Sequence, residues 1–168
     1  MIILGLDPGI AILGYGVVKK EKHKLKPIDF GTIQTSKELD EPQRLLSLAN
    51  SLEKLLDIYN PDVVAVEELF FNKNIKTAIT VAQARGVILM VILKKGISLY
   101  EYTPLQVKQG VVGYGRATKL QVQTMVKTLL NLEKIPKPDD AADGLAIAIC
   151  HNNFSAMNII SQKAGWSK

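Results

Sequence analysis

Residues 2–18 read IILGLDPGIAILGYGVV, and the fold can be worked out from this stretch. Residues 2–6 are a short, unbroken apolar run, which is the pattern of a central strand covered on both faces. The turn sequence DPG at residues 7–9 ends that strand, and residues 14–18 predict a second one. The stretch therefore predicts the first two strands of an antiparallel meander.

Apolar periodicity and capping residues place the remaining elements. A third strand is expected over residues 28–34, after a basic loop over residues 19–26. Next come a helix over about residues 42–59 with Asp40 as its N-cap, a strand over 63–66, a helix over about 75–95 that Gly96 ends, and a strand over 97–102. A short helix then starts at Pro104, capped by Thr103, and a glycine-broken loop follows over 110–115. The last two elements are a helix over 119–130 capped by Thr118 and a helix from about Asp139. This order predicts an α/β fold with a five-stranded mixed sheet, three antiparallel strands followed by parallel additions, and helices on both faces.

The composition indicates one packed domain. Of the 168 residues, 47% are apolar, and the mean hydropathy is +0.11, so the chain can bury a sizeable core. We expect a single domain over residues 1–154, with residues 155–168 as a C-terminal tail or an extension of the last helix. The sequence contains no 18-residue apolar segment and no basic leader followed by an apolar stretch, and we therefore expect a cytoplasmic protein.

The charge balance favours an anionic partner. The chain has 21 Lys and Arg against 16 Asp and Glu, a net charge of +5 and a pI near 9.2. Basic side chains release condensed counterions when they neutralise phosphates, so nucleic acid is a candidate partner. The single cysteine, Cys150, excludes an internal disulfide, and it follows an apolar run that predicts a buried position. No Cys/His cluster indicates zinc.

Four acidic residues stand where secondary-structure elements begin or end. Asp7 ends the first strand, Glu67 ends the fourth, and Asp140 and Asp143 begin the last helix, where their spacing places them on adjacent parts of one face. Carboxylate oxygens are the ligands that Mg²⁺ prefers, and two such ions can hold the attacking and leaving oxygens of a phosphodiester. The sequence therefore predicts a site for a hard divalent cation.

Each of these carboxylates also has a simpler interpretation. Asp7 can be a turn former, Glu67 a solvated strand end, and the two aspartates partners of the helix dipole. Glu68 neighbours Glu67, and strand parity cannot choose between them because the strand is predicted to be buried on both sides. Asp139 is four residues before Asp143, so helical spacing admits it as readily as Asp140.

Five stretches of the chain match one known family in both order and spacing. They are LGLDPGIAILGYGVV at residues 4–18, VAVEELFF at 64–71, QARGVIL at 83–89, QVKQGVVGYGRATKLQVQ at 106–123 and PDDAADGLAIAICH at 138–151. With these motifs the chain resembles the RuvC family of Holliday-junction resolvases, within the ribonuclease H-like superfamily, and the resemblance covers the chain to about Phe154.

The resemblance implies a ribonuclease H-like fold and a magnesium-dependent endodeoxyribonuclease. It implies that Asp7, Glu67, Asp140 and Asp143 bind two Mg²⁺ ions, for which Mn²⁺ can substitute, and that neighbouring Glu68 and Asp139 lie outside this set. The implied reaction is hydrolysis by a metal-activated water, with two symmetric nicks that resolve four-way DNA junctions in recombination and repair, leaving 5′-phosphate and 3′-hydroxyl ends. A branch-migration complex of the RuvAB type is the partner that the family implies.

Basic and aromatic residues are the candidate DNA contacts. The resemblance implies that Lys108 and Lys119 contribute to catalysis and DNA contact and that Phe70 stacks on unpaired bases, although paired phenylalanines are usually core residues. Phe71 is the less favoured of the two. The other candidates for phosphate contact are Lys73, Lys76, Arg116 and Arg85, the last with a structural role as its alternative.

Two symmetric cuts favour a two-fold homodimer, because one carboxylate site makes one cut. The helix over residues 75–95 has apolar residues on more than one face, so one face can pack on the sheet and another on a partner. His151 lies 11 residues beyond Asp140, about 16 Å along a helix, too far to share a metal. We therefore expect a core or surface histidine.

Three other functions fit part of the sequence. One is a ribonuclease H-like nuclease that acts on RNA or hybrid duplexes. Another is an actin-like or sugar-kinase ATPase, since LGLDPG resembles the first phosphate loop of that superfamily, although the chain is short for two such domains. The third is a DNA-binding protein without catalytic activity.

Overall fold

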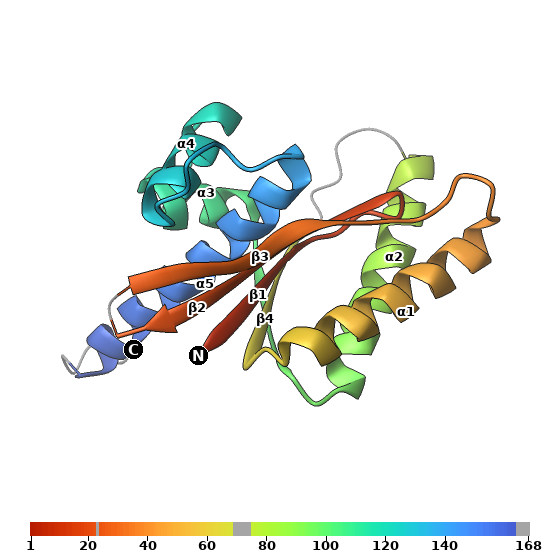
Figure 1. Cartoon of the computed structure of the whole chain (residues 1–168), viewed down its shortest axis with the longest axis horizontal. Helices are drawn as coiled ribbons and strands as arrows, with labels where there is room; N and C mark the ends of the chain where they lie inside the picture. The colour runs from red at the N-terminus through yellow and green to blue at the C-terminus, as the bar shows by residue number, and fades with distance from the viewer. Residues whose placement is uncertain (23, 69–74, 164–168) are drawn as a thin grey trace.

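The computed structural model describes residues 1–22, 24–68 and 75–163, and only the backbone of residues 75–77 and 156–163 (Figure 1). Its centre is a five-stranded sheet in the order β3-β2-β1-β4-β5. The strands are β1 (Ile2–Asp7), β2 (Ile12–Glu21), β3 (Lys24–Gln34), β4 (Val63–Glu67) and β5 (Ser98–Tyr102). The pairs β1–β2 and β2–β3 are antiparallel, whereas β1–β4 and β4–β5 are parallel. The predicted mixed sheet is therefore confirmed.

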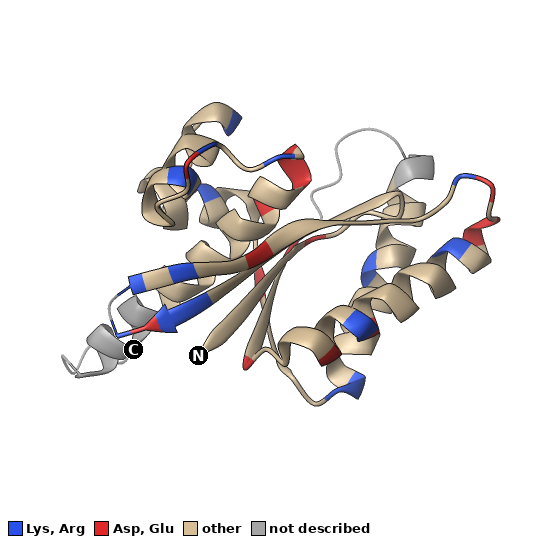
Figure 2. Cartoon of the chain, in the orientation of Figure 1, with Lys and Arg blue, Asp and Glu red and all other residues tan. Residues whose placement is uncertain are grey.

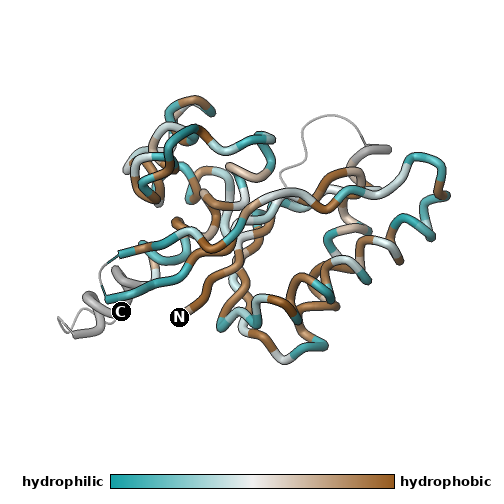
Figure 3. The backbone as a smooth tube through the Cα atoms, in the orientation of Figure 1, coloured by the Kyte–Doolittle hydropathy of each residue, from teal (hydrophilic) through white to brown (hydrophobic). Residues whose placement is uncertain are grey.

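Helices cover both faces of the sheet. They are α1 (Glu41–Tyr59), α2 (Ile75–Lys94), α3 (Pro104–Val112), α4 (Lys119–Leu129) and α5 (Asp139–Lys163). Figure 1 shows α1 and α2 on one side of the sheet and α3, α4 and α5 on the other. Alternate residues of β1 enter the two cores: Ile3 packs with the α5 side, and Leu4 and Leu6 with the α1 side. This double burial explains the unbroken apolar run, which makes β1 hydrophobic in Figure 3.

Three helices begin at the predicted N-cap residues. The side chains of Asp40, Thr103 and Thr118 each accept a hydrogen bond from the backbone N–H three residues further on. A glutamine at each of those positions completes a capping box, which satisfies two otherwise unpaired backbone groups. Because these caps fix where α3 and α4 begin, they also fix the backbone positions of Lys108 on α3 and Lys119 on α4.

The structure corrects two details. Most of the predicted basic loop over residues 19–26 is strand, because β2 continues to Glu21 and β3 begins at Lys24. The Glu21 carboxylate lies 3.0 Å from Lys19 of the same strand and 2.6 Å from Lys26 across the hairpin. Gly110 lies in α3 rather than in a loop. A Cβ atom at Gly110 would lie 3.0 Å from the Cα of Cys150, so this glycine serves close helix packing.

The helix α5 runs from Asp139 to Lys163 and crosses one face of the sheet (Figure 1). The predicted domain boundary at residues 154/155 therefore falls inside a continuous helix, and the division itself stays a prediction. Among the described residues, none of the helices has the length and apolar character needed to cross a membrane.

Candidate active site

The backbone of helix α5 packs directly against the backbone of the sheet, because glycines line the contact between them. A Cβ atom at Gly14 of β2 would lie 2.1 Å from the carbonyl oxygen of Asp140, and one at Gly16 would lie 2.4 Å from the backbone nitrogen of Leu145. Gly5 and Gly144 make similarly close backbone approaches. Any side chain at these positions would displace the helix, so the glycines determine how near the first turn of α5 comes to β1 and β2.

Asp7 and Glu67 lie side by side at one edge of the sheet. Their strands are parallel, Leu6 pairs with Val66, and the carboxylates follow at the next position of each strand. On the other side of β1, Asp7 pairs with Gly14 of the antiparallel strand β2, and Gly14 is in close contact with the Asp140 backbone. The topology therefore brings the ends of β1 and β4 to the start of α5.

The pKa values of Asp7 and Glu67 are raised, because both side chains are buried and lie close to other carboxylates. Burial raises the pKa of Asp7 to about 6, with further contributions from the charges of Asp143 and Asp140. Burial likewise raises the pKa of Glu67 to about 7, and the charges of Asp7 and Asp143 add to it. Asp7, Glu67, Asp140 and Asp143, hereafter the carboxylate cluster, thus act on one another across three elements of the fold.

Two lysines face this cluster from α3 and α4. Lys108 and Lys119 line a pocket of about 270 Å³ together with Glu67 and Asp143. The Lys119 ammonium donates to Asp143 Oδ2 at 3.0 Å. Burial alone would lower the pKa of Lys119, but this hydrogen bond and the nearby aspartate charges outweigh it and raise that pKa. Figure 2 shows the acidic start of α5 with basic residues on the neighbouring helices.

The two neighbouring acidic residues have other surroundings. Asp139 accepts one hydrogen bond from the Lys137 ammonium at 2.7 Å, and this contact lowers the pKa of Asp139, with a smaller contribution from Lys119. The backbone N–H of Glu68 donates to the Tyr102 carbonyl at 2.8 Å, which continues the sheet beyond β4. The charges that raise the pKa of Asp7 are those of Asp143 and Asp140 rather than those of these neighbours.

The donor set fits a hard divalent cation. In the described part of the chain, no three His, Cys, Asp or Glu side chains are already arranged to hold a metal ion together, and Asp143 is turned toward Lys119. The cluster nevertheless offers only carboxylate oxygens, and its mutual repulsion is the penalty that a divalent cation removes. His151 is in the core instead, with its Nδ1 2.9 Å from the Tyr102 hydroxyl.

The candidate DNA contacts are divided among several environments. Arg116 is exposed between α3 and α4, whereas Arg85 forms an ion pair with Glu101 and is only 22% exposed. That pairing supports the structural alternative for Arg85. Phe70 and Lys73 lie outside the described residues, as does Phe71, and the side chain of Lys76 is likewise not described.

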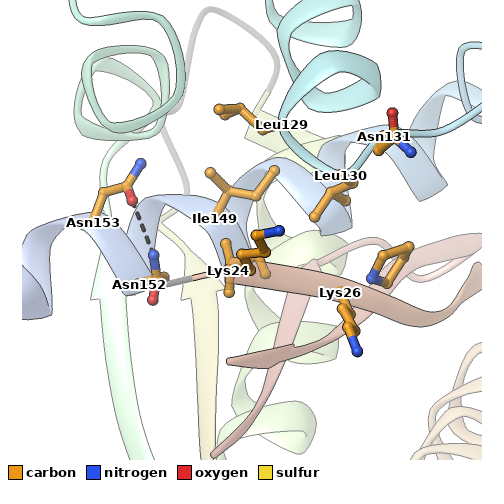
Figure 4. A pocket seen from close by; sticks show the side chains of 10 residues that line it. Lys24, Lys26, Leu129, Leu130, Asn131, Ile149, Asn152 and Asn153 are labelled. Carbon is orange, nitrogen blue, oxygen red and sulfur yellow. Dashed lines mark hydrogen bonds between the residues drawn. The ribbon is translucent and has the colours of Figure 1, made fainter. Parts of the chain in front are cut away.

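A larger groove lies at the opposite end of the sheet. It measures about 760 Å³ and opens between β3, the end of α4 and α5, with Lys24 and Lys26 beside Ile149 and Asn152 (Figure 4). Its ten lining residues include no carboxylate. This groove therefore does not compete with the carboxylate cluster as a metal site.

The chain matches a family model over residues 3–151, and that model describes the crossover junction endodeoxyribonuclease RuvC. The chain belongs to the RuvC family. It is 58% identical over 160 residues to the RuvC of Ruminiclostridium cellulolyticum, covering 95% of this chain and 96% of that protein. It is 56% identical to the RuvC of Alkaliphilus oremlandii, covering 94% and 98% of the two chains.

Solved RuvC structures have the same fold. RuvC of Thermus thermophilus superimposes with a TM-score of 0.85 at 35% identity and covers 94% of this chain and 97% of that one. The same protein in complex with a Holliday junction substrate gives a TM-score of 0.85 at 34% identity. The yeast mitochondrial Holliday junction resolvase, at 17% identity and a TM-score of 0.71, shares the fold. RuvC nucleases use divalent metal ions, which agrees with the chemistry of the carboxylate cluster.

Proposed function

We propose that this chain is a Holliday-junction resolvase, a homodimeric endodeoxyribonuclease that makes paired symmetric nicks in four-way DNA junctions. The observation that carries the proposal is the meeting of Asp7, Glu67, Asp140 and Asp143 at one edge of the sheet. Membership of the RuvC family and the likeness to a RuvC that was solved with its junction substrate support it.

The carboxylate cluster would hold two Mg²⁺ ions, with Mn²⁺ as a possible replacement. Bound ions of this kind supply an activated water and stabilise the charge that develops on a phosphodiester. The protein contributes the fixed position of the ligands: two carboxylates come from strand ends, and the other two come from one helix that glycines hold against the sheet. Asp139 and Glu68 are outside the proposed ligand set.

Lys108 and Lys119 are proposed to contact the scissile phosphate. Both line the same pocket as Glu67 and Asp143, so a phosphate beside the carboxylates would lie within their reach. Their positive charge would balance the negative charge that builds up on the phosphate during hydrolysis. Arg116 is proposed to contact the DNA backbone nearby, as are Lys73 and Lys76, whereas Phe70 is proposed to stack on unpaired bases.

The helix α2 is the proposed dimer interface. One of its faces is buried with α1, whereas Ile79, Met90 and Leu93 on another face are 56%, 53% and 61% exposed. Gly86 lies between them along the helix, and a Cβ atom there would meet no atom of the described residues within 4 Å. An exposed apolar stripe with a glycine near its middle suits close packing against a second α2. Two subunits would supply one active site for each nick.

The family also suggests a cellular setting. We propose that the enzyme works in the cytoplasm on chromosomal junctions and cooperates with a branch-migration complex of the RuvAB type. Residues 1–154 contain every proposed ligand and DNA contact, which is why we treat them as the nuclease domain.

Substrate preference tests the proposed function. The dimer should cut a mobile four-way junction in Mg²⁺, with little cutting of a linear duplex or an RNA–DNA hybrid of the same sequence. The D7N variant should bind the junction without cutting it, because it lacks one ligand of the proposed site. Preference for the hybrid would favour the ribonuclease alternative, and cutting by D7N would contradict the proposed ligand set.

A further inference from the structure

The Lys119 ammonium is shared by two carboxylates of α5. Its Nζ lies 3.0 Å from Asp143 Oδ2 and 3.7 Å from Asp139 Oδ2. The two aspartates are four residues apart, so they project from one face of the helix about one turn from each other. Lys119 is the first residue of α4, directly after the Thr118 cap, which fixes its backbone beside that face.

Only one of these two carboxylates belongs to the proposed ligand set. Asp143 is in the carboxylate cluster, and its side chain is 30% exposed. Asp139 lies toward solvent, where its Oδ1 accepts from Lys137 at 2.7 Å while its Oδ2 faces Lys119. Asp139 therefore connects the ammonium of Lys119 to a second lysine outside the cluster.

A divalent cation on Asp143 would compete with the Lys119 ammonium for that carboxylate, which Lys119 contacts at 3.0 Å. Both are positive, and like charges a few ångströms apart repel each other. A cation on Asp143 weakens the Lys119–Asp143 bond, so the ammonium needs another acceptor in order to stay beside the site. Asp139 is such an acceptor, because it is already within 4 Å and requires no change in the backbone.

We propose that Asp139 is a positioning residue that acts through Lys119. It holds the Lys119 ammonium beside the active-site pocket while Asp143 binds a divalent cation. The cation and Lys119, which is proposed to contact the phosphate, then do not compete for the Asp143 carboxylate. This inference rests on the proposed function, since it requires a cation at the carboxylate cluster. Lys137 limits the effect, because it competes with Lys119 for Asp139.

Mn²⁺ affinity measured without DNA tests the inference on the intact dimer. The D139N variant should bind Mn²⁺ about two- to five-fold more weakly in a calorimetric titration, the range that the loss of one exposed ion pair produces. The K137M variant should bind it more tightly. D139E should restore the affinity, because it keeps the carboxylate, and urea unfolding of each variant shows whether the fold is intact.

The double variant separates positioning from simple charge. If Asp139 acts through Lys119, D139N should have no further effect on Mn²⁺ affinity in a K119M background. An equal effect of D139N with and without Lys119 would overturn the inference, because Asp139 would then act only as a nearby negative charge. Unchanged Mn²⁺ affinity in D139N alone would overturn it as well.

A D143N control distinguishes this inference from the proposed function. D143N should bind Mn²⁺ much more weakly if the cluster is the metal site. Normal Mn²⁺ binding by D143N would contradict the proposed site itself, whereas loss in D143N with no change in D139N would contradict only the role of Asp139. Junction-cleavage kinetics add a second readout: D139N should lower kcat more than it raises KM, since Lys119 is misplaced during the reaction rather than absent from binding.

Discussion

Gly14 of β2 and Asp140 of α5 are in backbone contact: a Cβ atom on Gly14 would lie 2.1 Å from the Asp140 carbonyl oxygen. Since Gly14 also pairs with Asp7, this contact sets the separation between the strand-end carboxylate and the helix carboxylates. A residue without a side chain therefore governs the geometry of the proposed metal site.

Replacing Gly14 by alanine should displace the start of α5. We expect G14A to lower the free energy of unfolding by about 1–3 kcal/mol, as overpacking of a close contact does. Junction cleavage should fall by about 10²-fold at a temperature where the variant is folded, because small displacements of catalytic groups are costly. Urea unfolding and cleavage kinetics measure the two effects. Full activity in a folded G14A protein would show that the site tolerates a shifted helix.

The stability of the metal-free protein should depend on the pH between about 4 and 7. Asp7 and Glu67 have pKa values near 6 and 7 in the folded state, above their ordinary values. The folded protein therefore keeps the protons on Asp7 and Glu67 up to a higher pH than the unfolded chain does. As a result, the free energy of unfolding falls as the pH rises through this window. Urea unfolding should show the loss, and Mg²⁺ should reduce it.

An E67Q variant is the control for that pH effect. It removes one of the two titrating groups, so the difference in stability between pH 4.5 and pH 8 should be smaller than in the unchanged protein. Cleavage by the unchanged enzyme should rise over the same pH range, because the carboxylates bind cations only when deprotonated. An identical pH dependence in E67Q would mean that Glu67 is not buried beside other charges.

Removing the positive charge of Lys108 should slow cleavage more than it weakens binding. We expect K108M to lower the cleavage rate by about 10²-fold, which is typical when one group that stabilises developing charge is lost. Gel-shift titration should show a much smaller change in junction affinity. K127M is the matched control, since Lys127 is also on this side of the fold, on α4, but does not line the pocket. Equal effects of the two substitutions would contradict a specific role for Lys108.

A charge on the exposed face of α2 should dissociate the dimer. Met90 is 53% exposed in the isolated subunit, and the M90E substitution would bury a carboxylate in the proposed interface. Analytical ultracentrifugation should show a monomer, and paired nicking should become uncoupled. I58E provides the control, because Ile58 on α1 is 71% exposed and lies outside the proposed interface. A dimeric M90E protein would place the interface elsewhere.

Much of the fold follows from local patterns in the sequence. The N-caps of α1, α3 and α4 are where short polar side chains precede helical periodicity, and β1 is where an apolar run is too short for a helix. These signals are readable because they depend on neighbouring residues only. The predicted basic loop is wrong for a physical reason: Lys26 of β3 pairs with Glu21 of β2 across the hairpin, a contact that no single-strand pattern contains.

The sequence by itself determined which carboxylates stand at the ends of β1 and β4 and at the start of α5, and its motifs indicated the family. Periodicity alone left Glu67 beside Glu68 and Asp139 beside Asp140 as open alternatives. Only the tertiary structure decided that Asp139 shares Lys119 with Asp143 and that Arg85 pairs with Glu101. The reason is that local patterns report which face of an element is buried, whereas the partner of that face depends on close packing between distant segments, here made possible by Gly14, Gly16 and Gly144.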